Sequence, residues 1–145
     1  MAISWTLTID CHDATKQAAF WIEALGYAQA PPPEGWDSWE AWIQSFGLPV
    51  EELADGGKIE DPDGVLPSIG FLKVPEGKAV KNRLHLDLQV SGGRHLPAAE
   101  REAAIREYVA RVVALGASVV DEGDYNGGLD HVVMRDPEGN EFCVV

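Results

Sequence analysis

Hydrophobic and polar residues alternate in two segments of the chain, and a helical pattern follows each segment. In residues 3–10 every second residue is apolar, which is the period of a strand with one buried face. Residues 82–90 repeat the alternation, with apolar side chains on one face and polar ones on the other. Apolar residues then recur at helical spacing up to Gly26, and again over residues 98–115 up to Gly116. Each glycine is a typical helix end, so the pattern predicts a strand followed by a helix at both places.

Short motifs recur in the same order in both halves. ALGY at 24–27 corresponds to ALGA at 114–117, and DPDG at 61–64 corresponds to DPEG at 136–139. An aspartate followed by proline and a later glycine suits a tight turn, so each DPxG motif is predicted to join the last two strands of its half. The strands predicted beside these turns are 57–60, 68–74, 130–135 and 141–145, and a further short strand is predicted at 27–30.

The repeat predicts an α+β fold built from two βαβββ modules that form a cupped mixed sheet around a cleft. Module one covers about residues 1–76 and module two about residues 80–145. We expect both to belong to one domain over residues 1–145, because the length suits one domain and 46% hydrophobic residues can supply a core.

The first module carries an insert, GWDSWEAWIQSFGLPVEEL, that the second lacks. Within it Trp36, Trp39, Ile43 and Phe46 recur at helical spacing, and Trp42 lies beside them. The pattern predicts a short amphipathic helix over residues 36–46. Its tryptophans are expected to cap the cleft and contact a ligand, or else to cover a sheet face or a dimer seam.

Composition excludes several classes of partner. The net charge is −13, with 24 acidic and 11 basic residues, so the chain would repel nucleic acid and anionic membranes. Its two cysteines, Cys11 and Cys143, form no C-x-x-C cluster, which indicates neither a disulfide framework nor a structural zinc site. With no signal peptide or membrane span to be read in the sequence, we expect a cytoplasmic protein.

The two modules, with DPEGNEFCVV at 136–145 and NRLHLDL at 82–88, resemble the vicinal oxygen chelate superfamily of glyoxalases, bleomycin resistance proteins and dioxygenases, and its glyoxalase-like subgroup in particular. The resemblance covers essentially the whole chain. Metal-using members hold a divalent cation through a histidine or glutamine on the first strand of each module and a carboxylate on the last. Such an ion binds neighbouring substrate oxygens and stabilises an enolate or activates dioxygen.

Carried over to this sequence, the resemblance supplies only part of that ligand set. His85 matches the second-module histidine, whereas the first-strand position falls at about Thr6 and the final carboxylate position is Cys143. A hydroxyl group does not replace a carboxylate or an imidazole as a strong ligand. Glu141 shares a strand face with Cys143, so the ligands of any metal would be His85 and Glu141, with Asp87 as a third. We therefore expect no complete metal site and no cofactor. The alternative is a bound divalent metal.

Three functions remain open. The first is a protein that binds a small organic molecule, such as an antibiotic-like compound, without a metal. The second is a metal-dependent lyase, isomerase or dioxygenase of the superfamily. The third is a metal-free enzyme in which His85 is the general base and Asp87 orients it. The residues expected to touch the ligand are Thr6, Thr8, Trp39, Trp42, His85, Asp87, Glu141 and Cys143. A homodimer is expected, because the Trp-rich insert and the sheet edges add exposed apolar surface.

Overall fold

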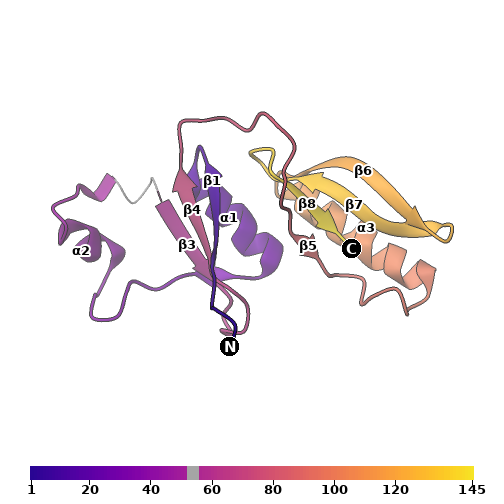
Figure 1. The fold of residues 1–145 in the computed structure, drawn as a ribbon, viewed down its shortest axis with the longest axis horizontal. Coiled ribbons are helices and arrows are strands. Elements are labelled where there is room, and N and C mark those ends of the chain that lie inside the picture. Colours follow the sequence, from indigo (N-terminus) through magenta and orange to yellow (C-terminus); the bar gives the residue numbers. More distant parts are fainter. Residues whose placement is uncertain (52–55) are drawn as a thin grey trace. The chain divides into compact units, whose positions relative to one another are not determined.

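The structure, a computed structural model, describes residues 1–51 and 56–145. The chain divides into two compact units, Met1–Gly77 and Lys78–Val145 (Figure 1). This boundary falls between the ranges that the sequence assigns to the two modules. The grouping of both units into one domain stays a prediction.

Unit 1 contains a four-stranded mixed sheet. Its elements are β1 (Leu7–Cys11), α1 (Ala14–Leu25), β2 (Ala28–Gln29), α2 (Trp39–Gln44), β3 (Gly56–Glu60) and β4 (Ile69–Lys73). The strand order is β1-β4-β3-β2. The first and last strands, β1 and β4, pair in parallel, and the other neighbours pair antiparallel.

Unit 2 repeats this topology. Its elements are β5 (Asp87–Leu88), α3 (Ala98–Ala114), β6 (Ser118–Tyr125), β7 (Gly128–Arg135) and β8 (Glu141–Val144). The strand order is β5-β8-β7-β6, and again the first and last strands are parallel while the others are antiparallel. Two sheets with one connectivity confirm the predicted α+β fold of two βαβββ modules.

The aspartate of each DPxG motif organises the turn between the last two strands of its unit. Main-chain N–H groups of Asp63, Val65 and Leu66 donate to the Asp61 carboxylate at 2.9–3.0 Å. Those of Glu138 and Asn140 donate to the Asp136 carboxylate at 2.9–3.0 Å. These bonds hold the pKa of Asp61 below its ordinary value. The predicted turns are therefore confirmed at both places.

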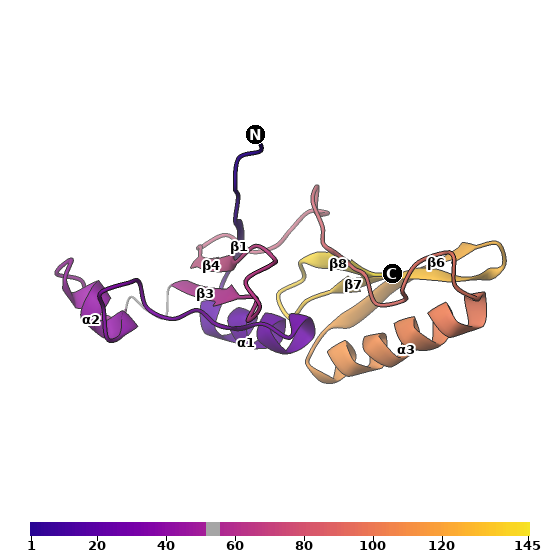
Figure 2. The ribbon, with the colours of Figure 1, turned by 90° about the horizontal axis from the view of Figure 1, so that it is seen from below.

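One helix covers one face of each sheet (Figure 2). Helix α1 packs on β3 and β4, and helix α3 packs on β7 with smaller contacts to β6 and β8. The apolar side chains between helix and sheet are buried, which is what the strand alternation requires. In unit 1 this core includes Ala18, Trp21, Ile59, Ile69 and Phe71; in unit 2 it includes Ile105, Val112, Val132, Met134, Phe142 and Val144.

The first strand of each unit is shorter than the alternation predicts. Residues 3–6 precede β1, and Ile3 and Trp5 are 91% and 67% exposed. Only two residues form β5, and Leu84 is 85% exposed, although the pattern places it on the buried face. For residues 3–6 and 82–84 the reason is pairing, because β4 begins at Ile69, opposite Leu7, and β8 begins at Glu141, opposite residue 85. The predictions of strands over 3–10 and 82–90 were wrong at these ends.

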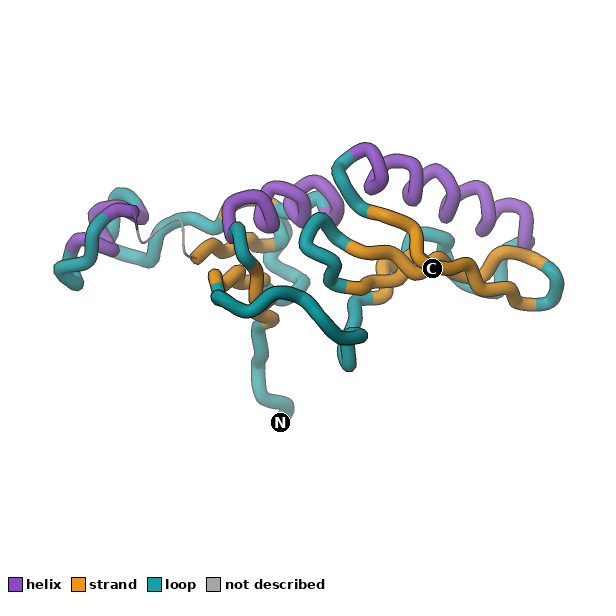
Figure 3. The backbone as a smooth tube through the Cα atoms, turned by 90° about the horizontal axis from the view of Figure 1, so that it is seen from above, coloured by secondary structure: helices purple, strands orange, loops and turns teal. Residues whose placement is uncertain are grey.

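The insert forms a helix, but a shorter one than the predicted 36–46. Helix α2 begins after Ser38, whose hydroxyl accepts from the Ala41 N–H at 3.1 Å, and it ends at Gln44. The last residues of the insert, 52 and 53, lie outside the described residues. None of the described helices combines the length and apolar character that crossing a bilayer requires. Figure 3 shows the helices in purple among long loop segments, of which residues 74–86 form one.

Candidate functional site

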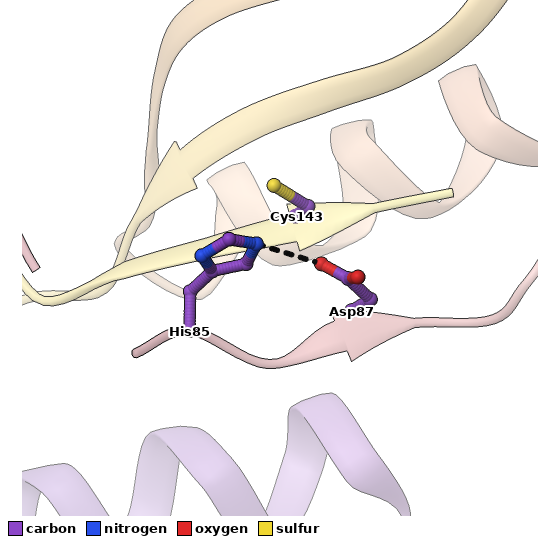
Figure 4. A group of neighbouring side chains, drawn as sticks. All are labelled: His85, Asp87 and Cys143. Atoms are coloured by element: carbon purple, nitrogen blue, oxygen red, sulfur yellow. Dashed lines mark ion pairs between the residues drawn. The ribbon is translucent and has the colours of Figure 1, made fainter. Parts of the chain in front are cut away.

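Three residues with chemically useful side chains come together on unit 2. His85 lies two residues before Asp87 on β5, and Asp87 pairs across the parallel ladder with Cys143 on β8. One ligand atom from each side chain lies within 4.8 Å of the others (Figure 4). The parallel register of β5 and β8 thus gathers residues far apart in the sequence.

His85 and Asp87 form a contact pair within this group. His85 Nε2 lies 3.1 Å from Asp87 Oδ1, and the two side chains are 47% and 50% exposed. A carboxylate this close to one ring nitrogen orients the imidazole. The pair could therefore accept or deliver a proton at the surface of the sheet.

Cys143 is poorly suited to be a nucleophile or a thiolate ligand. It is 9% exposed, and burial raises the pKa of its thiol. The Asp87 carboxylate raises that pKa further through its charge and by accepting a hydrogen bond from the thiol. This raised pKa keeps Cys143 a neutral thiol at neutral pH. Only the thiolate is reactive, so Cys143 is a weak nucleophile and a weak ligand.

The group does not fit a tight divalent metal site. A zinc site needs deprotonated ligands, so an ion would have to displace the proton of the Cys143 thiol. His85 Nε2 and Asp87 Oδ1 lie 3.1 Å apart, so these two donors alone could share an ion, and the misfit comes from the third donor and from the number of donors. A harder cation needs more oxygen ligands than this group supplies.

Glu141 is occupied elsewhere. Its carboxylate forms an ion pair with Lys81, and Arg135 Nη2 lies 3.9 Å from its Oε1. The hydrogen bond from Lys81 is the largest cause that lowers the pKa of Glu141. Glu141 is thus engaged with Lys81 and is not a member of the group of His85, Asp87 and Cys143, and the ligand pair His85 and Glu141 that the sequence offers for a metal stays a prediction.

Thr6 and Thr8 belong to unit 1. Thr6 is exposed and precedes β1, while Thr8 lies on β1 opposite Gly70 of β4. A Cβ at Gly70 would lie 3.4 Å from Thr8 Oγ1, so the two share the sheet face opposite the buried Ile69 and Phe71. Thr8 therefore lies on the face of the unit 1 sheet that α1 does not cover.

Trp39 and Trp42 line a cavity of about 550 Å³ in unit 1. Their rings meet edge to face with centroids 5.4 Å apart, and Phe46 stacks against Trp42 in the same way at 5.1 Å. Trp39 Nε1 donates to the Ala30 carbonyl at 2.9 Å, which fixes α2 to the chain after β2. The rest of the lining comes from α1 and the edge of the sheet and includes Ala14, Ala18, Ile22, Gln29, Gly57 and Lys58.

This cavity lies on the helix side of the sheet. A Cβ at Gly57 would lie 3.8 Å from both the Ala14 carbonyl oxygen and Ala18 Cβ, so this side of β3 faces α1. The sequence led us to expect the tryptophans over the mouth of the cleft. The structure instead places Trp39 and Trp42 beside α1, away from the face that carries Thr8.

A charge cluster in unit 2 was not predicted from the sequence. Arg94 donates two hydrogen bonds to Asp130, from Nε at 2.8 Å and from Nη2 at 2.7 Å. Arg101 Nη1 lies 3.5 Å from Asp130 Oδ1, and His131 Nδ1 lies 3.2 Å from Oδ2. The Arg94 hydrogen bonds are the main cause that holds the pKa of Asp130 far below its ordinary value.

A signal for this cluster does exist in the sequence. Arg101 precedes Ile105 by four residues and so falls on the apolar stripe of α3. Asp130 alternates with Val132 and Met134 on the buried face of β7. A cation and an anion, each on the buried face of facing elements, indicate an internal ion pair.

Comparisons with known proteins agree with this fold. The model of the glyoxalase-like domain family matches residues 6–145. No curated protein matches the chain. Among solved structures, a glyoxalase/bleomycin resistance protein/dioxygenase family enzyme from Burkholderia phytofirmans PsJN is 16% identical with a TM-score of 0.60, over 96% of this chain and 94% of that one.

Two further structures are similar. A variant of the fosfomycin resistance protein FosX from Listeria monocytogenes, in complex with Mn(II) and 1S,2S-dihydroxypropylphosphonic acid, is 14% identical with a TM-score of 0.60, covering 99% of this chain and 89% of that one. A possible glyoxalase from Bacillus cereus is 13% identical with a TM-score of 0.56, over 97% and 95% of the two chains. The chain belongs to the glyoxalase-like domain family.

Proposed function

We propose that this protein binds a small, largely apolar organic molecule in the cavity of unit 1, and that no metal ion takes part. The observation that carries the proposal is the cavity itself. Its volume of about 550 Å³ falls within the range of about 300–1,000 Å³ that is usual for ligand sites.

The lining suits a flat apolar ligand. Two tryptophans offer large apolar surfaces, and small residues such as Ala14 and Ala18 leave room beside them. Polar groups are few and come from Thr15, Gln29 and Lys58, which is the usual composition of a site that fixes orientation with a few hydrogen bonds.

Titration with N-phenyl-1-naphthylamine tests the proposal. This uncharged aromatic probe fluoresces strongly in apolar surroundings, and its binding should quench tryptophan emission saturably at one site per chain. An apolar organic ligand of this protein should displace the probe. The absence of saturable binding by the folded protein would contradict the proposal.

We predict that the purified protein carries no stoichiometric zinc, nickel, manganese or iron. The reason is the donor set, in which Cys143 stays protonated and Glu141 is paired with Lys81. Elemental analysis of protein purified without chelators measures this. About one ion per chain, lost in His85→Ala, would overturn the prediction and restore metal-dependent lyase, isomerase or dioxygenase chemistry.

The contact between His85 and Asp87 favours a second candidate function, metal-free proton transfer. In it His85 is the general base and Asp87 orients the ring, as their 3.1 Å separation permits. A screen of small carbonyl compounds for deuterium uptake from D2O tests this candidate. Uptake should survive chelators and be lost in His85→Gln, while uptake by His85→Gln at the wild-type rate would exclude His85 as the base.

We also predict a homodimer, in a protein of the cytoplasm. Large apolar side chains remain exposed in unit 1, among them Ile3, Trp5, Val65 and Leu66. Together with the Trp-rich insert and the sheet edges, these side chains are candidates for a contact between two copies of the chain. Sedimentation equilibrium at micromolar concentration should give twice the 15.7 kDa of the chain. A single 15.7 kDa species would refute the dimer.

A further inference from the structure

A second cavity, formed by unit 2, contains a buried cation that is only partly compensated. The cavity measures about 400 Å³, and its polar lining includes Asp87, Gln89, Ser91, Arg94, Arg101 and Asp130. Arg101 is 4% exposed, which is rare for an arginine unless its charge is paired.

The pairing of Arg101 is weak. Its guanidinium reaches Asp130 Oδ1 only at 3.5 Å, and its Nε has no hydrogen-bond partner among the residues that the structure describes. The Asp130 oxygens are already engaged by Arg94 at 2.8 and 2.7 Å and by His131 at 3.2 Å. Burial of a charge without a close partner is costly, so a buried guanidinium in this state indicates a missing anion.

The charges around the cavity specify what kind of anion fits. Around Asp130, two guanidinium groups, Arg94 and Arg101, face one carboxylate. Asp87 is the second carboxylate of the lining and brings its formal charge to zero. A ligand with two negative charges would therefore meet more repulsion from Asp87 than a ligand with a single carboxylate that pairs with Arg101.

We propose that the cavity of unit 2 binds a small monocarboxylic acid, whose carboxylate pairs with the guanidinium of Arg101. The planar guanidinium matches a carboxylate in geometry, and hydrogen bonds between two charged groups are among the strongest in proteins. Gln89 and Ser91 lie on the same lining and supply neutral polar groups for the rest of the ligand. This site is separate from the apolar cavity of unit 1 and does not depend on it.

Three four-carbon probes separate charge from shape. Butyrate has one carboxylate, succinate has two, and butyramide is the neutral counterpart of butyrate. The readout is the NMR resonance of the Arg101 Nε–Hε group in 15N-labelled protein, assigned by its loss in Arg101→Lys. Butyrate should shift this resonance saturably, succinate more weakly, and butyramide not at all. A butyramide shift equal to that of butyrate, or no saturable butyrate shift, would overturn the proposal.

Variants test which arginine carries the site. Arg101→Met should weaken butyrate binding, followed by backbone amide shifts, by at least about tenfold, since it removes a charged hydrogen-bond donor. Arg94→Gln should weaken it too, because Asp130 then becomes free to pair with Arg101. Arg106→Gln is the matched control: it removes the same charge from α3, but Arg106 is 51% exposed and pairs with Glu102 and Glu122.

The outcomes are decisive in either direction. Unchanged binding in Arg106→Gln together with loss in Arg101→Met supports the proposal. Equal butyrate affinity in Arg101→Met and the wild type would refute it. If Arg101→Met does not fold, Arg101→Lys replaces it, since the lysine keeps the charge but loses the planar donor pair and should bind butyrate more weakly. Binding of N-phenyl-1-naphthylamine should be unaffected in all of these variants, so failure here leaves the apolar cavity of unit 1 untouched.

Discussion

Asp130→Asn should lower the free energy of unfolding by about 3 kcal/mol, whereas Arg101→Met should lower it by less than about 1 kcal/mol, although both residues belong to one ion pair. The two residues are 8% and 4% exposed. Removing one partner of a buried pair is costly when the remaining charge is left without compensation. The asymmetry follows from which residue has other partners.

Asp130 retains its partners when Arg101 is removed. Arg94 still donates two hydrogen bonds and His131 still contacts Oδ2, and methionine fills much of the volume of arginine. Without Asp130, in contrast, Arg101 has no counter-ion within 4.0 Å among the described residues. Urea unfolding at neutral pH, with similar m-values for both variants, measures the difference. Equal losses in the two variants would contradict this account of the cluster.

The same cluster gives a defined dependence on pH. The hydrogen bonds from Arg94 hold the pKa of Asp130 below the value of about 3.9 that an unfolded aspartate has. A folded-state pKa that is lowered contributes stability above the unfolded value and loses it as pH falls toward the folded value. Stability should therefore drop below about pH 4, and Asp130→Asn should flatten that drop in part. Asp13, Asp61 and Glu141, whose pKa values are also lowered, would account for the remainder.

Trp42→Ala should weaken binding of N-phenyl-1-naphthylamine by more than about tenfold, because truncation of a tryptophan that packs against a ligand commonly costs about 2 kcal/mol or more and a tenfold change is about 1.4 kcal/mol. Trp42 lines the cavity of unit 1 and also joins the rings of Trp39 and Phe46. Its loss removes ligand contact and loosens the aromatic cluster together. Fluorescence titration of the probe measures the change.

Two further variants separate ligand contact from the support of α2. Trp39→Phe keeps an aromatic ring but loses the hydrogen bond to the Ala30 carbonyl, so it should weaken binding less than Trp39→Ala. Trp36→Ala is the matched control, because Trp36 is 39% exposed and lies outside the cavity lining. Equal affinity of Trp36→Ala, Trp39→Ala and Trp42→Ala for the probe would show that the cavity is not its site.

The two sites make different use of polar groups. In unit 1 most of the lining is apolar, so affinity there should depend on shape and on the area buried from water. In unit 2 the cavity is lined by charges, and the His85–Asp87 pair shares that lining through Asp87. A ligand held by Arg101 would thus lie near a residue that can orient a base.

The sequence alone determined the repeat, and with it the succession of elements in each module. Alternation over the first strands, the helix-ending Gly26 and Gly116, and the paired DPxG turns act over a few residues, so local pattern suffices to read them. The strand orders β1-β4-β3-β2 and β5-β8-β7-β6 were not predicted from the sequence. His85 and Asp87 were placed on one strand face by the same period of two.

What only the tertiary structure decided depends on contacts between distant segments. Strand ends were overpredicted because alternation does not report where the partner strand begins, as at residues 3–6 beside β4. Helical spacing predicted α2 but not the sheet face on which Trp39 and Trp42 lie. Cys143 meets Asp87 only through the register of β5 and β8. The pairing of Arg94 and Arg101 with Asp130 joins a loop, a helix and a strand, and its energetics depend on burial that no local pattern reports.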